Sequence, residues 1–569
     1  MTAFLIDNIA PLMFLTLVIV LLMGYPVAFA LAAVGLGFGV LGIQLGLLQP
    51  ALLQALPERI WGVMSNDTLL AVPFFTFMGL ILERSGMAED LLDTIGQLFG
   101  AVRGGLAYAV IFVGALLAAT TGVVAASVIS MGLISLPIML RYGYDRRLAS
   151  GVIAASGTLA QIIPPSLVLI IMADQLGRSV GDMYAGAFVP GLMLAAFYAL
   201  FVLGATLMRP AWAPALPLEA RTLREADGNS GNRSLLVLTV VTVAIGVTFW
   251  VMYYNQRHAE VSTDERIIVT TSVAIGAAFG FALVNKVLRL NLLSQMAERV
   301  TFVLIPPLAL IFLVLGTIFL GVATPTEGGA MGATGALIMA LARRRLSLKL
   351  LKQAMNVTAK LSTFVVFILI GARVFSLTFY GVNGHVWVEH LLTSLPGGQL
   401  GFLIVVNILI FVLAFFLDFF ELAFIVVPLL APVAEKLGID LIWFGVLLAV
   451  NMQTSFMHPP FGFALFYLRS VAPDKAYLDR VTGRSIAPVT TGQIYWGAVP
   501  FVVIQVIMVG LIIAFPNIVS GGLQTKAKVD TQNIHIQVPP TGGAGSTEQD
   551  DATRALEKAM GGGAPDTAK

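Results

Sequence analysis

The sequence predicts an all-α polytopic membrane protein, with about 12 transmembrane helices plus two re-entrant hairpins in an inverted repeat. The first observation is composition: of 569 residues, 58% are hydrophobic and only 11% are charged, whereas soluble domains are about a quarter charged. The second is that apolar stretches long enough to cross a bilayer recur along the chain. The third is that 56 Gly and 27 Pro residues are frequent enough to interrupt helices.

This composition excludes a soluble enzyme and a nucleic-acid-binding protein as descriptions of the whole chain, because too few charges are present to cover a soluble surface. The mean hydropathy is +0.91, and the net charge of +2 indicates no particular partner. The chain contains no cysteine, which excludes disulfides, thiol catalysis and cysteine-ligated metal.

The predicted spans begin with a retained pair of helices rather than a cleavable signal, because Asp7 and no basic residue precedes the first apolar stretch. A span needs about 20 apolar residues. Windows of that size predict spans near residues 10–24, 26–46, 66–84, 148–172, 184–208, 235–254, 266–285, 301–322, 326–342, 361–383, 441–468 and 493–515.

Two apolar stretches do not fit this template. Residues 104–140 are interrupted at 120–122, and residues 397–434 are interrupted around Asp418. Each stretch is short for two spans and long for one, so we predict a hairpin whose tip stops inside the membrane. The backbone groups at such a tip must be buried in protein or face a wet cavity.

Basic residues orient the spans, because Lys and Arg are retained on the cytoplasmic side. The first hairpin has basic residues at both ends, so we predict a cytoplasmic base. The second ends beside Lys436 with acidic neighbours, which predicts a periplasmic base. Basic cytoplasmic loops are predicted within 209–233, 343–352 and 469–484, and both termini are predicted to be periplasmic.

An internal repeat relates two parts of the chain. Segment 143–166 aligns with 438–461, so that two Gly-x-Asp motifs and two Pro-Pro pairs each match at an offset of 295 residues. The interruptions of the two hairpins fall at about the same offset. Because the copies face opposite ways by the charge rule, we predict an inverted repeat, as in many secondary transporters.

Four regions follow from this repeat. The first repeat is 1–209, with hairpin 104–140 and broken helix 148–172; a cytoplasmic loop and two inserted helices (235–285) occupy 210–300; the second repeat is 301–519, with hairpin 397–434 and broken helix 441–468; and 520–569 is a disordered polar tail.

The two Pro-Pro pairs, Pro164-Pro165 and Pro459-Pro460, predict a helix break in each repeat, because proline removes a backbone donor and clashes with the preceding turn. Freed carbonyls and side-chain oxygens suit a hard cation such as Na⁺, and half-helix N-termini suit anionic groups. The alternative is a kink whose hydroxyls satisfy the freed backbone. The Na⁺ candidates are Ser156, Gly157 and Thr158 at the first break and Asn451, Gln453, Thr454 and Ser455 at the second; the substrate candidates are Gln161, Ser166 and His458.

The hairpin tips add further polar groups. At the second tip Asp418 and Glu421 lie three residues apart and would share a helix face. Charges within a membrane are usually functional, and the alternative is a position near the periplasmic mouth. The first tip offers Thr120, Thr121, Gly122 and Ser127, whose hydroxyls could instead cap helix ends.

Three further residues each have more than one possible role. Glu327 follows a proline at the start of a span, which fits helix capping and function equally. Arg373, inside span 361–383, would attract a substrate carboxylate or, more simply, pair with an acidic residue. His458 is a lone histidine, more often structural than a ligand or proton relay. No metal-binding, zinc-protease or P-loop motif occurs in the sequence. We therefore expect the protein not to be an enzyme, and to bind no cofactor and no metal other than Na⁺.

Six segments carry a family resemblance: PFFTFMGLILERSG (73–86), RGGLAYA (103–109), SLPIMLRYGYD (135–145), SGTLAQIIPPS (156–166), GVATPTEGGAMGA (321–333) and GIDLIWFGVLLAVNM (438–452) with the HPP that follows. On these segments the chain resembles the large membrane subunit of tripartite ATP-independent periplasmic (TRAP) transporters. The tips AATTGVVAAS (118–127) and DFFELAF (418–424) resemble the longer subgroup associated with mannitol or chloroaromatic compounds.

The resemblance implies an elevator-type transporter of the ion-transporter superfamily, with two Na⁺ sites that each join a hairpin tip to a broken helix. On matching residues, the first site would use Thr121 and Gly122 with 156–158, and the second Asp418 with 451–455. It also implies a bacterial inner-membrane location, a soluble periplasmic binding protein, a small four-helix membrane subunit on a separate chain, and organic acids as substrates.

We therefore expect Na⁺-coupled uptake of an organic acid, such as a dicarboxylate, that a periplasmic binding protein delivers. One alternative is a stand-alone Na⁺/H⁺ or anion antiporter of the same superfamily, with Asp418, Glu421 or Glu327 as proton carriers. A distant alternative is an intramembrane enzyme, which has the least support because no nucleophile–base or metal constellation appears in the sequence.

Overall fold

The computed structural model describes residues 2–121, 124–223, 231–254, 263–415, 417–459 and 462–521; for 118–121 it describes the backbone alone. Residues 1–523 form one compact unit. The predicted tail lies outside the described residues from 522 onward. Helices dominate the described chain, and its two short strands, β1 (Tyr477–Leu478) and β2 (Ser485–Ile486), pair antiparallel.

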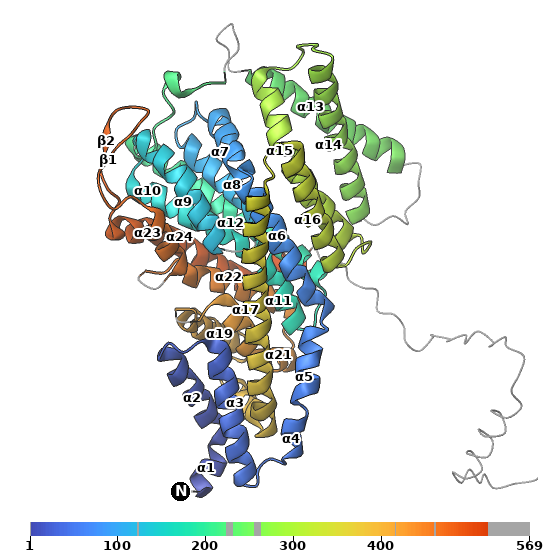
Figure 1. The fold of residues 1–569 in the computed structure, drawn as a ribbon, viewed down its shortest axis with the longest axis vertical. Helices are drawn as coiled ribbons and strands as arrows, with labels where there is room; N and C mark the ends of the chain where they lie inside the picture. Colours follow the sequence, from blue (N-terminus) through green and yellow to red (C-terminus); the bar gives the residue numbers. More distant parts are fainter. Residues whose placement is uncertain are drawn as a thin grey trace, which may run out of the picture. The chain divides into compact units, whose positions relative to one another are not determined.

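The elements before the predicted insertion are helices joined by short connections (Figure 1). They are α1 (Thr2–Asp7), α2 (Ile9–Leu22), α3 (Val27–Gln44), α4 (Ala51–Gln54), α5 (Leu56–Met64), η1 (Asp67–Leu70), α6 (Ala71–Arg84), α7 (Met87–Leu98), α8 (Gly105–Thr121), α9 (Val124–Arg141), α10 (Arg146–Thr158), η2 (Leu159–Gln161), α11 (Leu167–Gln175) and α12 (Val180–Met208).

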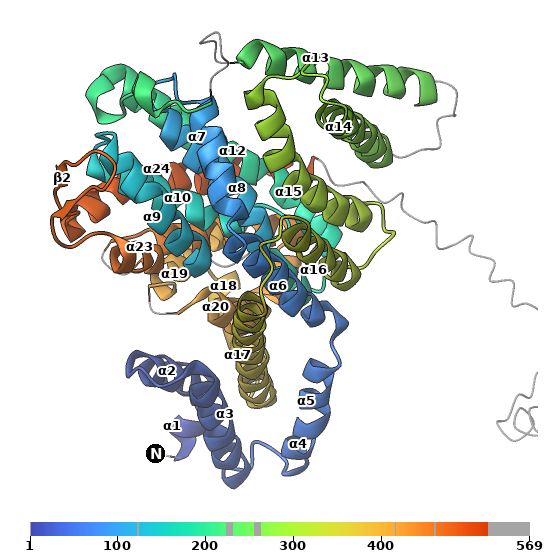
Figure 2. The ribbon, with the colours of Figure 1, turned by 45° about the horizontal axis from the view of Figure 1, so that its top comes forward.

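Two short turns, η3 (Pro210–Trp212) and η4 (Leu218–Ala220), lead to the helices of the predicted insertion. These are α13 (Asn232–Phe249), which continues into the π-helical η5 (Trp250–Tyr254), and α14 (Thr263–Val287). Both helices pack against each other and against α15 (Gln295–Phe319), as Figure 2 shows.

The remaining elements follow α15 in the chain. They are α16 (Pro325–Ala342), α17 (Leu348–Gly381), α18 (Gly384–Thr393), α19 (Gly398–Leu413), α20 (Phe419–Ile425), α21 (Val427–Lys436), α22 (Leu441–Phe456), α23 (Phe463–Val471), α24 (Thr491–Ala514) and α25 (Asn517–Ser520).

The described chain has the helices of a polytopic membrane protein. Eight of them are long and apolar enough to cross a bilayer, or up to ten if each of two bent pairs counts as one span. The bent pairs are Ala51–Met64 with Asp67–Arg84, at 45°, and Gly384–Thr393 with Gly398–Leu413, at 116°. The more detailed expectation of about 12 spans and two re-entrant hairpins stays a prediction.

Two predicted spans are parts of longer helical stretches. The span predicted at 66–84 is preceded by α4 and α5, and the one predicted at 361–383 belongs to α17, which begins at Leu348. The first turns of α17 carry Lys349 and Lys352, so a hydropathy window stops short of them. Ser347 nevertheless caps this helix, because its side chain accepts a hydrogen bond from the Leu350 N–H.

Small residues bring the long helices together, as is common where helices pack in membranes. A Cβ on Gly35 of α3 would lie 2.9 Å from the Phe375 backbone, and one on Gly371 of α17 would lie 2.5 Å from the Ala28 carbonyl oxygen. On α16, a Cβ on Gly332 would lie 2.5 Å from the Met78 sulfur of α6. Helix α3 thus packs along α17, and α6 packs along α16 (Figure 1).

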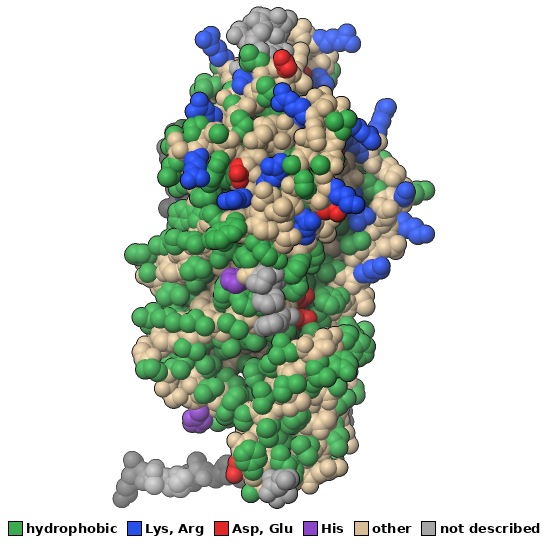
Figure 3. Space-filling model, turned by 90° about the vertical axis from the view of Figure 1, so that its left-hand side faces the viewer, with side chains coloured by type: hydrophobic (Ala, Val, Ile, Leu, Met, Phe, Trp, Pro, Cys, Tyr) green, Lys and Arg blue, Asp and Glu red, His purple; other side chains and the backbone are tan. Residues whose placement is uncertain are grey.

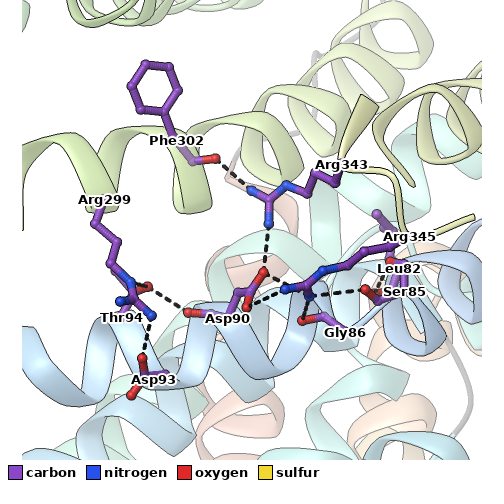
Figure 4. A network of polar contacts seen from close by, with 10 residues as sticks. All are labelled: Leu82, Ser85, Gly86, Asp90, Asp93, Thr94, Arg299, Phe302, Arg343 and Arg345. Carbon is purple, nitrogen blue, oxygen red and sulfur yellow. Dashed lines mark hydrogen bonds and ion pairs between the residues drawn. The ribbon is translucent and has the colours of Figure 1, made fainter. Parts of the chain in front are cut away.

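A network of ion pairs ties α7 to α15 and to the connection between α16 and α17 (Figure 4). Asp90 accepts hydrogen bonds from Arg343 at 3.0 Å and from Arg345 at 3.2 Å, and Asp93 pairs with Arg299. Arg345 also donates to the carbonyls of Ser85 and Gly86 at the end of α6. These contacts hold α7 to helices more than 200 positions away in the sequence.

Charged side chains are unevenly placed on the molecule. On the face drawn in Figure 3, Lys and Arg gather toward one end, while hydrophobic side chains cover most of the remainder. Segregation of this kind is typical of a protein whose basic loops lie on one side of a bilayer.

Candidate functional site

The first helix break lies between α10 and α11, where the sequence has Pro164 and Pro165. Helix α10 ends at Thr158, η2 follows, and α11 begins after Ser166. The peptide bond between the two prolines is cis. Ser166 caps α11: its Oγ accepts a hydrogen bond from the Val168 N–H at 3.2 Å and donates to the Gln161 carbonyl at 2.7 Å. Ser166 and the Gln161 carbonyl therefore satisfy each other within the break.

The second break lies between α22 and α23. Helix α22 ends at Phe456, and the His458 carbonyl then accepts a hydrogen bond from the Gly462 N–H at 2.7 Å. The His458 ring stacks on Phe415 at 4.7 Å and meets Phe411 edge-on at 5.4 Å. This aromatic packing holds the histidine beside the end of α19. Pro460 lies outside the described residues.

The two breaks meet in a buried polar cluster. Nε2 of Gln453, on α22, donates to Oγ1 of Thr158, on α10, at 3.2 Å and lies 3.5 Å from the Tyr198 hydroxyl. Nε2 of Gln505, on α24, donates to the same hydroxyl at 2.7 Å. All four side chains are buried, so α10, α12, α22 and α24 share one hydrogen-bonded centre.

The first predicted hairpin contacts α10 just before the point where α10 ends at the break. A Cβ on Gly114 of α8 would lie 2.5 Å from the Ser156 Cβ, and one on Gly157 would lie 2.4 Å from the Val128 side chain of α9. Both helices of the hairpin thus approach α10 at neighbouring residues. The Ser156 Oγ is fully buried and has no hydrogen-bond partner within the described residues.

The second predicted hairpin meets α22 in a related way. Nδ2 of Asn451 donates to the Asn407 carbonyl of α19 at 2.7 Å, and the Ser455 hydroxyl donates to the Phe411 carbonyl at 3.3 Å. Asn407 is buried, and its side-chain oxygen has no partner within the described residues.

These oxygen-rich contacts can hold a small hard cation. Na⁺ takes neutral oxygen ligands, such as hydroxyls, amide oxygens and backbone carbonyls, of the kind present at Ser156 and Asn407. A buried acceptor without a partner is costly, so a bound cation would satisfy it. No cluster of three His, Cys, Asp or Glu side chains that suits a metal ion occurs in the described part of the chain.

The acidic pair of the second tip caps a helix. The Asp418 carboxylate accepts a hydrogen bond from the Glu421 N–H at 2.9 Å, and the Glu421 carboxylate accepts one from the Asp418 N–H at 2.8 Å. This reciprocal arrangement is a capping box at the start of α20. Glu327 does the same for α16, with Thr324 as its partner.

The other predicted site residues are placed as follows. The Thr454 hydroxyl bonds back to the Val450 carbonyl of its own helix at 3.1 Å, and Ser127 is buried on α9. Thr120 and Thr121 belong to the end of α8, but their side chains are not described, and Gly122 lies outside the described residues. Arg373, on α17, has no carboxylate partner within the described residues and lines a cavity.

Tyr198, Asn407 and Gln505 were missed by the sequence analysis. Asn407 and Gln505 each lie in the apolar middle of a helix, and intramembrane polar residues of this kind indicate a buried contact or a site. That signal was available for both. Nothing in the sequence around Tyr198 distinguishes this residue from the other aromatic residues of the apolar helices.

Comparison with known proteins covers almost the whole chain. The family model described as "Tripartite ATP-independent periplasmic transporter, DctM component" matches residues 14–518. This range includes both helix breaks, both predicted hairpins and the cavity lined by Arg373.

Relatives with assigned names are similar over much of their length. The "C4-dicarboxylate TRAP transporter large permease protein DctM" of Pseudomonas aeruginosa is 26% identical over 75% of this chain and 82% of its own. The "Sialic acid TRAP transporter permease protein SiaT" of Haemophilus influenzae is 24% identical over 82% of this chain and 61% of its own. The solved YdaH transporter of Alcanivorax borkumensis covers 83% of this chain and 90% of its own at 13% identity, but its TM-score of 0.48 is too low to support an argument.

Proposed function

We propose a mechanism for this chain from the premise that it belongs to the DctM family, the DctM component of the tripartite ATP-independent periplasmic transporters. The chain is accordingly a multi-pass membrane subunit of a secondary transporter for organic acids. Its relatives are named as permeases rather than enzymes.

The proposed activity is Na⁺-coupled uptake of an organic carboxylate across the bacterial inner membrane. A periplasmic binding protein delivers the carboxylate, and a small membrane subunit on a separate chain completes the complex. The family's tripartite name and the relatives' names for C4-dicarboxylate and sialic acid support this proposal.

Two Na⁺ ions are proposed to bind where each hairpin meets a broken helix. The observation that carries this is that two of the buried side-chain oxygens without described partners, Ser156 Oγ on α10 and Asn407 Oδ1 on α19, lie where a hairpin helix contacts a helix that breaks. Neutral ligands at both places suit a monovalent cation, since no carboxylate is needed to balance a double charge.

Sodium would act by differential affinity. An ion that takes ligands from a hairpin and from a broken helix stabilises the conformation in which the two are in contact, and only that conformation gains the binding energy. The inverted repeat belongs to the same proposal: the hairpins and broken helices form a moving part, and helices such as α3, α6, α16 and α17 form a scaffold in an elevator mechanism.

The test needs no knowledge of the substrate. The melting temperature of the purified chain with its small subunit is measured in NaCl, KCl and choline chloride. We expect a saturable rise specific to Na⁺, since a ligand of the folded state at tenfold its Kd stabilises by about 1.4 kcal/mol. Ser156→Ala together with Asn451→Ala should abolish the rise.

The matched control is Ser150→Ala, because Ser150 is also a fully buried serine of α10 without a described hydroxyl partner, but lies further from the break. This variant should keep the Na⁺ response. Equal melting in the three salts would contradict Na⁺ coupling, and a response to pH in place of Na⁺ would favour the antiporter alternative.

A further inference from the structure

A cavity of about 500 Å³ lies between α4, α5, α11, α17, α20 and α21. Small-molecule sites commonly have volumes of roughly 300–1,000 Å³. Its polar lining comes from Arg59, Gln175, Arg373, Ser376 and Tyr380, and its apolar lining includes Leu369, Leu377 and Phe424. None of these residues belongs to the two helix breaks described above, whereas Phe424 is the last residue of the second tip segment, 418–424.

The cavity is cationic. Arg373 is half-buried in the middle of an apolar stretch of α17, and Arg59 faces the same cavity from α5. The ion pairs of the described residues involve other arginines, and neither Arg59 nor Arg373 takes part in one. An arginine inside a membrane protein ordinarily pairs with an acidic group or marks a ligand path.

The nearest acidic side chain of α11 is already engaged. Asp174 precedes Gln175, and its two oxygens accept hydrogen bonds from the Asn66 and Gln175 amides at 2.8 and 2.7 Å. Asp174, which does not line the cavity, thereby holds the Gln175 amide next to it. Asp174 is thus committed to the two amides, and no ion pair between it and either arginine occurs in the described structure.

We propose that this cavity binds a small organic carboxylate, with Arg59 and Arg373 as the charged ligands. A guanidinium presents a fork of N–H donors that matches a carboxylate. Two guanidinium groups on different helices therefore suit a ligand with two carboxylates, or with one carboxylate and one polar group. The Tyr380 and Phe424 rings provide an apolar wall for the carbon skeleton. The inference rests on the proposed function, because it gives the transported anion a place to bind away from the Na⁺ sites.

The position of the cavity indicates when it acts. Helix α17 begins after the basic connection that includes Arg343 and Arg345, predicted to be cytoplasmic, and Arg373 lies near its other end at Gly381. The cavity would therefore be reached from the periplasmic side, so a carboxylate released by the binding protein meets it before the helix breaks.

The test uses the absence of natural cysteine, because a single introduced thiol is the sole reaction site. Ser376→Cys places it three residues after Arg373, on the same side of α17, in the cavity lining. Labelling rates are measured in KCl with a sulfonate-bearing and a trimethylammonium-bearing methanethiosulfonate. We expect the anionic reagent to react faster.

Removing each arginine should change this preference. One unit charge at about 8 Å, with an effective dielectric constant of about 60, alters a rate by about threefold. Arg373→Gln and Arg59→Gln should each slow the anionic reagent and speed the cationic one, so that their rate ratio falls by roughly tenfold. Arg373→Lys keeps the charge and should keep the ratio. Arg480→Gln, an exposed arginine in the connection between α23 and α24, is the matched control and should also leave it unchanged.

Binding is then tested by protection. Succinate, a dicarboxylate, should slow labelling of the introduced thiol, and the uncharged succinamide should not. Protection should disappear in Arg373→Gln. The proposal would be overturned if the ratio of anionic to cationic labelling rates is the same in Arg59→Gln and Arg373→Gln as in the parent. A lack of protection by succinate, or equal protection by sulfate, would also overturn it. Because the measurement is made without Na⁺, a missing Na⁺ effect on melting would count against the proposed coupling and not against this site.

Discussion

Oγ1 of Thr158 accepts a hydrogen bond from Nε2 of Gln453 at 3.2 Å, and the two residues are 295 positions apart. The same offset aligns the two Pro-Pro pairs and the two Gly-x-Asp motifs. Residues at equivalent positions of the proposed repeats therefore touch each other. Such a contact is expected where a local pseudo-two-fold axis passes between the two broken helices.

The contact between the two breaks predicts energetic coupling. Thr158→Val and Gln453→Leu should each lower the free energy of unfolding by about 1 kcal/mol, the usual contribution of one hydrogen bond. The double variant should lose about 0.5–1.5 kcal/mol less than the sum, because both changes remove the same interaction. Thermal unfolding in detergent measures this cycle. The control pairs Thr158→Val with Thr454→Val. Because the Thr454 hydroxyl donates to a carbonyl of its own helix, the two losses should be additive.

The packing of α10 on α24 predicts a strong effect of one methyl group. A Cβ on Gly151 would lie 2.1 Å from the Gly497 carbonyl oxygen, which is far inside van der Waals contact. Gly151→Ala should therefore push the helices apart and cost about 1–3 kcal/mol of unfolding free energy. Gly510→Ala, on α24 with no atom within 4 Å of the new Cβ, is the control and should be neutral or slightly stabilising. Equal melting temperatures for the two variants would contradict this account of the interface.

The capping box at α20 predicts different results for two substitutions of one residue. Asn also caps helices well, so Asp418→Asn should keep near-parental stability and keep the Na⁺ response. Asp418→Ala removes the acceptor for the Glu421 N–H and should cost about 1 kcal/mol. Melting curves in NaCl and KCl check both. Loss of ion-dependent behaviour in Asp418→Asn, at unchanged stability, would instead assign the carboxylate a proton- or ion-carrying role.

The ion pair in the connection between α23 and α24 predicts a pH-dependent stability. Hydrogen bonds from Thr482, with further contributions from Arg141, hold the pKa of Asp479 below its ordinary value. A depressed pKa in the folded state stabilises the fold above the unfolded pKa of about 3.9, and this contribution is lost as the pH falls through the folded value. The parent should therefore melt above Asp479→Asn at pH 7, and the difference should shrink toward pH 3.

The exposed Asp474, in the same connection, provides the comparison for that measurement. Asp474→Asn should melt like the parent at both pH values, because no ion pair of the described residues involves this side chain. A difference between parent and Asp479→Asn that stays constant from pH 7 to pH 3 would show that the carboxylate charge is not the cause.

Features with a local cause could be predicted from the sequence. Pro164 and Pro165 remove backbone donors wherever they occur, so the break between α10 and α11 follows from the sequence alone. The same holds for the break after α22 and for the helices α13 and α14 of the predicted insertion, whose apolar stretches are long enough to span a bilayer. The polytopic membrane class follows from composition, and family membership follows from motifs.

Features that depend on how helices face each other could not be predicted. Whether Arg373 meets a carboxylate or a cavity depends on the rotation of α17 against α5 and α11. Gly371 and Phe375 set that rotation through their close contacts with α3, which are seen only once the helices have packed. Gln505 and Tyr198 lie 307 residues apart and meet only after α12 and α24 have packed. The sequence shows that these groups are polar within apolar helices, but it does not show what each one contacts.

The network at Asp90 has a mechanical consequence. Because α7 is fixed to α15 and to the connection after α16, the proposed movement of the first predicted hairpin relative to those helices would be absorbed by torsion between α7 and α8. That connector contains Gly100 and Gly104, the latter with φ of 78°, which non-glycine residues adopt at a cost. The connector is hydrogen-bonded to Ala213 and Leu216, so these two residues would have to move together with the connector or lose those hydrogen bonds.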